Sequence, residues 1–172
     1  MKILDATAGS RGIWVQKNHP YVTFMDKRKG KFVSYQSPKD KRTYEVNPDV
    51  VASWDNMPFK DETFDMVVFD PPHIIKKQKT PSRLEIQYSY LDKDIWRKTL
   101  KDAFINLFRV LKQDGIFILK WCESNKPIED IIALSPYPPL FANKTINHNP
   151  KTKDSYMVVF LKYDVNEKLN IN

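Results

Sequence analysis

The sequence predicts a single α/β domain built on a mostly parallel sheet. The 172 residues are 41% hydrophobic and 13% aromatic, a globular composition, and a chain of this length forms one domain with a substantial core. Short apolar segments alternate with helical ones, which favours parallel strands joined by right-handed crossovers. Three of the apolar segments end in Asp5, Asp26 and Asp70. Because ligands bind at the carboxyl ends of parallel strands, the predicted site lies there.

The first half of the chain carries the strands that end in these acids. We expect, in order, a buried strand at 2–5, a turn of small residues at 6–12, a brief helix at 13–17, a strand at 21–25, a hairpin of residues 32–36 and 42–46, a weak strand at 50–53 and a central strand at 66–69. The hairpin is predicted as an insertion at about 31–46 with a basic tip. Residues 74–93 are basic and lack periodicity, so we predict an active-site loop there.

The second half contains one long amphipathic helix, predicted at 94–112. Its apolar residues fall on one stripe at helical spacing and predict core packing: Trp96, Leu100, Ala103, Phe104, Leu107, Phe108 and Leu111. Asp92 or Asp94 is the candidate cap at its start, and Asp114-Gly115 is its candidate end. Beyond it we expect a strand at 116–121, a short helix at 128–134, a loop at 135–154 and a last strand at 155–163.

Composition excludes several classes of protein. The single cysteine, Cys122, rules out an internal disulfide and a cysteine-based zinc site, and the three histidines have no metal-ligand spacing. We therefore predict no metal. No apolar run approaches the roughly 20 residues of a membrane span, and the N-terminus has no signal-peptide pattern. These features favour a cytoplasmic protein without a membrane partner.

Basic residues gather beside the predicted site. Residues 26–42 hold seven basic side chains against two acids, residues 73–101 hold eight against three, and the whole chain carries a net charge of +7. A basic rim of this kind fits a polyanionic partner such as nucleic acid. The alternative is an ordinary solvated surface rich in lysine.

The central strand ends in the most informative motif, Asp70-Pro71-Pro72-His73. Proline cannot donate to a strand ladder and fixes its own φ, so the chain must leave the sheet at Asp70. The carboxylate and nearby carbonyl oxygens then suit a substrate that offers hydrogen-bond donors, such as an amino group. The alternative is that the two prolines only end the strand.

The turn after the first predicted strand forms the other half of the predicted site, where we expect a nucleotide without its phosphates to bind. The turn Asp5-Ala6-Thr7-Ala8-Gly9-Ser10-Arg11-Gly12 is small, and Gly9 and Gly12 permit a positive φ, but the turn is not a dinucleotide fingerprint and lacks a phosphate-binding lysine. Asp26, 21 residues beyond Asp5, is placed to accept ribose hydroxyls, or else is an acid neutralised by Lys27 and Arg28. Residues 53–59 could form the wall against an adenine ring.

In this order the motifs resemble class I S-adenosylmethionine-dependent methyltransferases. The glycine turn and Asp-Pro-Pro resemble the amino-directed branch, which methylates exocyclic nitrogens of bases, and the stretch 47–73 with 117–121 resembles small methyltransferases of phages and mobile elements. The resemblance implies a Rossmann-like sheet, mostly parallel with an antiparallel last strand and helices on both faces. It also implies S-adenosyl-L-methionine as cofactor. The implied cofactor-binding residues are Asp5, Ala6, Thr7, Gly9, Gly12, Asp26, Lys27, Ser53, Trp54, Asp55 and Asp70.

The implied catalytic residues are Asp70, Pro71, Pro72 and His73. His73 departs from the family pattern, which has a tyrosine, phenylalanine or tryptophan there to stack on the target base. Trp121, Tyr88 or Tyr90 could supply that platform, although Trp121 fits the core better. Lys76, Lys77 and Lys79 are the remaining candidates for substrate binding.

Methyl transfer to an exocyclic amino nitrogen of a nucleic-acid base is therefore the leading hypothesis, with DNA adenine N6 favoured. RNA, a small molecule or a protein remain alternatives, as does a non-catalytic nucleic-acid-binding subunit. Because the first predicted strand begins at residue 2, we expect an open cofactor site, or closure by the 74–93 loop or by a second subunit in a homodimer.

Overall fold

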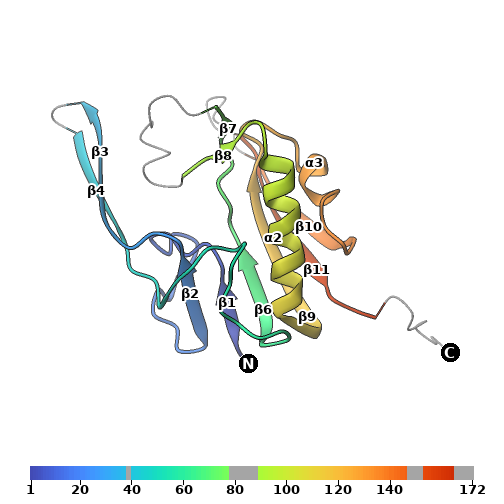
Figure 1. Ribbon diagram of the computed structural model, residues 1–172. Helices are drawn as coiled ribbons and strands as arrows, with labels where there is room; N and C mark the ends of the chain where they lie inside the picture. Colours follow the sequence, from blue (N-terminus) through green and yellow to red (C-terminus); the bar gives the residue numbers. More distant parts are fainter. Residues whose placement is uncertain (38–39, 78–88, 147–152, 165–172) are drawn as a thin grey trace.

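A seven-stranded sheet forms the centre of the computed structural model (Figure 1), which describes residues 1–37, 40–77, 89–146 and 153–164. The strand order is β10-β11-β9-β6-β1-β2-β5. The strands are β1 (Ile3–Asp5), β2 (Val22–Asp26), β5 (Val50–Val51), β6 (Phe64–Phe69), β9 (Leu111–Cys122), β10 (Pro139–Thr145) and β11 (Ser155–Leu161). Neighbours from β5 to β9 are parallel, whereas β11 and β10 add antiparallel pairs. The predicted mostly parallel α/β sheet is confirmed.

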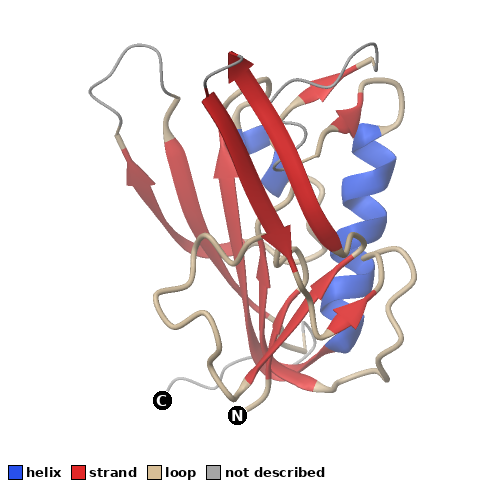
Figure 2. Cartoon of the chain, turned by 90° about the vertical axis from the view of Figure 1, so that its left-hand side faces the viewer, coloured by secondary structure: helices blue, strands red, loops and turns tan. Residues whose placement is uncertain are grey.

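Helix α2 (Trp96–Val110) covers one face of this sheet, as Figure 2 shows, and buries the predicted apolar stripe. Phe104 and Leu107 are fully buried against Phe69 and Phe117 of the sheet. Full burial of such a side chain contributes roughly 1.5–3 kcal/mol, so this layer supplies much of the driving force for folding. The short helix α3 (Ile128–Ile132) contributes to the same core.

Both predicted ends of α2 are wrong. Ile95 precedes the helix without any side-chain cap, and the Asp92 carboxylate accepts instead from the backbone N–H of Asp94. The helix ends at Val110 because Leu111 is already extended and begins β9. Asp114, at φ +59°, forms an irregularity within β9 rather than a helix end.

The opposite face of the sheet is covered differently. Ile13 and Trp14 pack there against Ile3, Phe24 and Val68, but residues 13–17 form turns and bends, so the predicted helix is wrong. In the described ranges both helices, α2 and α3, pack into the same core, so helices on both faces are not observed.

Strands β3 (Gly30–Ser37) and β4 (Asp40–Val46) form the predicted hairpin as a separate two-stranded sheet. It projects past the carboxyl end of β2, at the end of the molecule where β6 and β9 also finish (Figure 1). Within the predicted 74–93 loop, β7 (Ile75–Lys76) pairs in parallel with β8 (Leu91–Asp92) and fixes both ends of the segment. Predicted substrate residues Lys79 and Tyr88 lie outside the described residues.

The structure has strand β10 within residues 135–154, where the sequence predicts a loop, so that prediction is wrong there. All seven of its residues are exposed, so no alternation of buried and exposed side chains marks it in the sequence. It forms the edge of the sheet, where a proline at the first position of a strand is tolerated. Among the described residues no helix is long and apolar enough to cross a membrane.

Candidate active site

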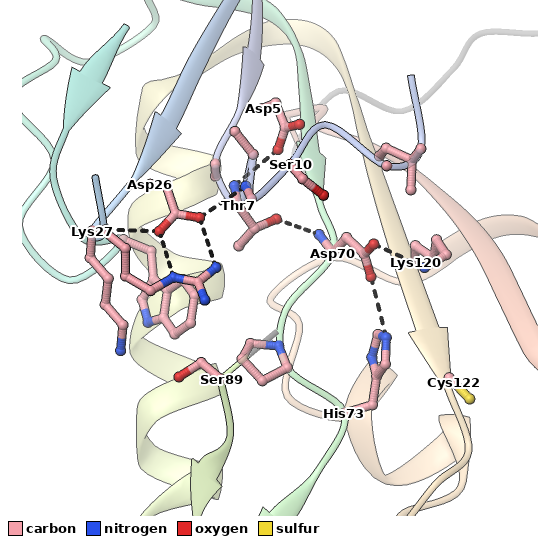
Figure 3. Close-up of a pocket in the computed structure, with 18 of the residues that line it drawn as sticks. Asp5, Thr7, Ser10, Asp26, Lys27, Asp70, His73, Ser89, Lys120 and Cys122 are labelled. Carbon is pink, nitrogen blue, oxygen red and sulfur yellow. Dashed lines mark hydrogen bonds and ion pairs between the residues drawn. The ribbon is translucent and has the colours of Figure 1, made fainter. Parts of the chain in front are cut away.

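A cavity of about 460 Å³ opens at the carboxyl ends of β1, β2, β6 and β9 (Figure 3). It is lined by the turn after β1, the end of β2, residues 52–54, the segment after β6 and the end of β9. The structure thereby brings Asp5, Asp26 and Asp70 into one cavity, as their positions at strand ends predict. Ala6, Thr7, Gly9 and Gly12 line it as well.

Asp5 holds the turn after β1 in place. It is 1% exposed, and its two carboxylate oxygens accept hydrogen bonds from the backbone N–H of Thr7 at 3.0 Å and from Trp14 Nε1 at 2.7 Å. The turn needs one glycine, Gly9, which has φ +50°. The other positive φ in the turn belongs to Arg11 and not to Gly12.

Burial, above all, raises the pKa of Asp5 to about 6. The hydrogen bonds from Thr7 and Trp14 offset part of this rise in pKa, while repulsion from Asp70 and Asp26 adds to it. Three carboxyl groups therefore share one cavity in which the negative charge on Asp5 is unfavourable. Lys27, Arg28 and Lys120 line the same cavity, so it holds basic as well as acidic side chains.

The Asp26 carboxylate lies at the end of β2 and is 6% exposed. It accepts from the backbone N–H of Gly9 at 2.9 Å and from that of Arg28 at 2.8 Å. The Arg28 side chain also donates to it, from Nε at 3.2 Å and from Nη2 at 3.3 Å. Arg28 therefore neutralises Asp26, which is the alternative considered from the sequence. A ribose could bind to the Asp26 carboxylate only if the two longer guanidinium contacts were broken.

The segment after β5 lines part of the cavity. Ser53 and Trp54 lie on the cavity, and the Trp54 ring packs edge-on against Phe69 with a centroid distance of 5.4 Å. The Lys27 ammonium, also at the cavity, lies 5.9 Å from the centre of the Trp54 ring. Asp55 is exposed and not part of the cavity, so its predicted cofactor contact is not observed.

The Asp70 motif is tied to the turn after β1, because the backbone N–H of Asp70 donates to the Thr7 hydroxyl at 2.7 Å. Asp70 Oδ2 accepts from Lys120 Nζ at 2.9 Å. Asp70 Oδ1 is buried, lies 3.4 Å from His73 Nε2 and makes no hydrogen bond within the described part of the chain. Both prolines are buried, and of the two only Pro72 lines the cavity.

His73 lines the cavity as an uncharged ring. Burial lowers the pKa of His73 to about 4, with the attraction of Asp70 opposing this shift and repulsion from Lys120 adding to it. Its ring meets Trp121 edge-on at a centroid distance of 5.4 Å. Trp121 is fully buried and donates from Nε1 to the Lys126 carbonyl at 3.0 Å, so it belongs to the core and its predicted substrate contact is wrong.

The other candidates for substrate binding that the structure describes do not line the cavity. Lys76 and Lys77 are not among its lining residues, and Lys77 pairs with Asp94 at 3.1 Å. Tyr90 is half-buried and also not part of the cavity wall.

Sequence reasoning missed a polar group at the ends of β9 and β11: Lys120, Cys122, Ser124 and Ser155 all line the cavity. Lys120 carried a usable signal, because a lysine interrupts an otherwise apolar strand. Phe69 pairs with Leu119 in the β6–β9 register, so the next residues along the two strands, Asp70 and Lys120, lie side by side. Among the described residues no cluster of three or more histidine, cysteine or acidic side chains is placed to hold a metal ion.

No family model matches the sequence, and no curated protein does. Solved structures match the fold, and one is the PH0226 protein from Pyrococcus horikoshii OT3, with a TM-score of 0.59 and 16% identity over 94% of this chain and 81% of that one. A second is the Burkholderia thailandensis 1,6-didemethyltoxoflavin-N1-methyltransferase with bound 1,6-didemethyltoxoflavin and S-adenosylhomocysteine, with a TM-score of 0.53 and 14% identity over 94% and 71%. A third is the 16S rRNA (adenine(1408)-N(1))-methyltransferase from Catenulisporales acidiphilia with S-adenosylmethionine, with a TM-score of 0.50 and 11% identity over 94% and 84%. The chain therefore has the fold of class I S-adenosylmethionine-dependent methyltransferases.

Proposed function

We propose that this protein transfers a methyl group from S-adenosylmethionine to an exocyclic amino nitrogen of a nucleic-acid base, with adenine N6 of DNA as the favoured target. One observation carries the proposal. Asp70 stands at the carboxyl end of β6 with a buried oxygen that makes no hydrogen bond among the described residues, and it lines the same cavity as Gly9 and Asp26. An acceptor for an amino group and a candidate nucleoside site thus share one space.

The residues of the cavity fit the cofactor. Asp5, Asp26 and Asp70 would face its two positive charges, on the sulfur and on the amino group, and the basic side chains that line the same cavity would face its carboxylate. Gly9 would let the chain pass close to the methionine part, and Asp26 would bind the ribose once the Arg28 side chain had moved. Ser53 and Trp54 would contact the adenine ring.

When bound, S-adenosylmethionine supplies a methyl group that its positively charged sulfur has already activated for displacement. The chain's own part is to hold the amino group in line with that methyl group. Asp70 Oδ1 accepts one N–H, and a main-chain carbonyl of the proline turn accepts the other. These bonds draw the nitrogen lone pair out of the aromatic ring. After the transfer the nitrogen is positively charged, and its proton passes to Asp70 and then to solvent.

The β3–β4 hairpin supports a nucleic-acid substrate. Lys29, Lys31, Lys41 and Arg42 are exposed on or beside it. Phe32 and Tyr44 lie opposite each other across the strands, and the Arg28 guanidinium lies 5.5 Å from the Phe32 ring centre. Basic side chains beside aromatic rings bind phosphates and stack on bases. The structural similarity to an rRNA adenine methyltransferase supports a nucleic-acid substrate. The similarity to the toxoflavin enzyme supports a small heterocycle as the alternative substrate.

The test is transfer of labelled methyl from S-adenosylmethionine to double-stranded DNA, single-stranded DNA and RNA. Asp70→Ala is the test variant, and Asp102→Ala, which removes an exposed carboxylate of α2, is the matched control. The proposal expects label in nucleic acid with the wild type and the control, and none with Asp70→Ala. Label confined to protein or to a small heterocycle would contradict the nucleic-acid substrate.

A second candidate is a non-catalytic nucleic-acid-binding subunit, which the occupation of Asp26 by Arg28 favours. Thermal unfolding with and without S-adenosylmethionine separates the two. A bound ligand raises the free energy of unfolding by about 2.7 kcal/mol at a hundred times its Kd, whereas a site that has lost the cofactor shows no shift.

A further inference from the structure

We propose that Lys120 and Asp70 form a donor–acceptor pair that selects an amino group attached next to an unprotonated ring nitrogen. Adenine presents this edge through N6 and N1, and cytosine through N4 and N3. The inference rests on the proposed function and names the base edge that the site recognises. Lys120 is here a residue that contacts the substrate, a role that the resemblance of the sequence does not imply.

The two oxygens of Asp70 are unequal. Oδ2 is held by Lys120 Nζ at 2.9 Å, whereas Oδ1 is buried without a hydrogen bond in the described residues. A buried acceptor without a donor is unfavourable by about 1–3 kcal/mol, so Oδ1 would be stabilised by a donor. Its surface is covered in the free protein, and a ligand reaches it only when the His73 ring beside it shifts. The ion pair fixes the direction in which this free oxygen points.

Lys120 has donors left after binding Asp70. An ammonium group carries three N–H bonds, and Asp70 uses one of them. The Lys120 side chain is 29% exposed and lines the cavity, so a ligand can reach the others. The pair therefore offers the ligand an acceptor and a donor side by side.

His73 does not duplicate the cationic role of Lys120. Its pKa of about 4 leaves it uncharged near neutral pH, and its Nδ1 is buried without a partner among the described residues. Lys120 is thus the cation in contact with Asp70, whose backbone is held from the other side by the Thr7 hydroxyl.

An acceptor beside a donor complements an amino group beside a ring nitrogen. Oδ1 accepts from the amino N–H while Lys120 donates to the ring lone pair. Guanine places a protonated N1 on one side of its amino group, where the ammonium would be repelled, and an unprotonated N3 on the other, so the pair discriminates against guanine only on the Watson–Crick edge. Thymine offers no amino group at all. Since the Watson–Crick edge of adenine is hidden in duplex DNA, this reading also requires the base to leave the helix.

The experiment replaces single atoms of the substrate. Three single-stranded oligonucleotides carry one target base each: adenine, 1-deazaadenine without the N1 acceptor, or 7-deazaadenine as the matched control that keeps N1. Single-turnover methylation is measured with the wild type, Lys120→Met and Lys120→Arg. Loss of a ring nitrogen makes the amino group more electron-rich and therefore more nucleophilic, which by itself would speed the reaction. A slower reaction of 1-deazaadenine would therefore reflect the lost contact to N1.

With the wild type we expect adenine and 7-deazaadenine to react at similar rates and 1-deazaadenine about 10- to 100-fold more slowly. Lys120→Met should remove the difference between adenine and 1-deazaadenine and slow both, because Asp70 loses the partner that orients it, while Lys120→Arg should restore part of the difference. Equal rates for adenine and 1-deazaadenine with an active wild type would overturn this inference and leave the proposed function standing. No label in any nucleic acid would overturn the proposed function, and this assignment with it. The comparison of the three oligonucleotides with the wild-type protein tests the proposal even if a variant fails to fold.

Discussion

The backbone N–H of Asp70 donates to the side-chain hydroxyl of Thr7 across 2.7 Å. This bond joins the turn after β1, where the cofactor is proposed to bind, to the motif after β6, where the amino group is proposed to react. Thr7 thus adds a side-chain bond to the β1–β6 pairing that also holds the two halves of the site together.

Thr7→Val should uncouple these halves. The valine keeps the shape of the side chain but leaves the Asp70 N–H without its acceptor, at a cost of about 1–3 kcal/mol in the free energy of unfolding. Methyl transfer should fall more than cofactor affinity does. Urea unfolding, isothermal titration and single-turnover kinetics measure the three quantities. Thr7→Ser keeps the hydroxyl and is the control, and equal losses in both variants would contradict the role of this bond.

Arg28→Gln should tighten binding of S-adenosylmethionine. The Arg28 side chain occupies the Asp26 carboxylate at 3.2 and 3.3 Å, so the ribose has to displace it. Removing two such charge-assisted contacts should raise affinity by roughly 5- to 20-fold if each offsets up to about 1 kcal/mol of binding free energy. Titration calorimetry measures the change, with Lys29→Gln as the neighbouring control. Weaker binding in the Arg28 variant would instead make the arginine part of the cofactor site.

Cofactor affinity should rise with pH through the range around pH 6. The pKa of Asp5 is about 6 in the folded, ligand-free protein, mainly because the carboxyl group is buried. A positively charged ligand favours the ionised form and lowers that pKa, so below about pH 6 binding must release a proton. Affinity therefore increases as pH rises and levels off above about pH 7, while His73, with its pKa of about 4, does not titrate in this window.

Titration calorimetry between pH 5 and 8 tests this dependence. Asp5→Asn has no proton to release, so its affinity should be nearly independent of pH across the same range. A wild-type profile as flat as that of the variant would exclude Asp5 as the group responsible.

Nucleic-acid binding should depend on the hairpin. Each phosphate contact contributes about one unit to the slope of log affinity against log salt. Lys29→Ala with Lys31→Ala should lower that slope by about two units and leave cofactor binding unchanged. Lys17→Ala with Lys60→Ala removes two exposed lysines elsewhere and is the matched control. A similar drop in both double variants would point to a diffuse charge effect rather than a hairpin site.

The sequence was informative where backbone chemistry leaves a local trace. Proline after Asp70 and the acids at the ends of β1 and β2 mark where strands must stop, and these three acids meet in one cavity. Strand β10 left no trace, because all of its residues are exposed and no buried face imposes alternation. The start of α2 was misplaced because Asp92 bonds to a preceding turn instead of to the helix.

Side chains contributed by neighbouring strands were the hardest to foresee. Lys120 lies 50 residues from Asp70 along the chain, and only the β6–β9 register brings the two together. Asp55 and Trp121 were misassigned for the converse reason: both are close in sequence to site residues, but Asp55 faces solvent and Trp121 faces the core. Arg28 could be foreseen as a neighbour of Asp26, but not as a group that fills its acceptor positions.

Cys122 is the only cysteine of the chain, and it lines the cavity two residues beyond Lys120. A thiol-reactive fluorophore would therefore attach at a single position, beside the proposed base site, without any other residue being changed. The protein thus carries its own attachment point for an optical sensor, which would report the arrival and departure of ligands in real time.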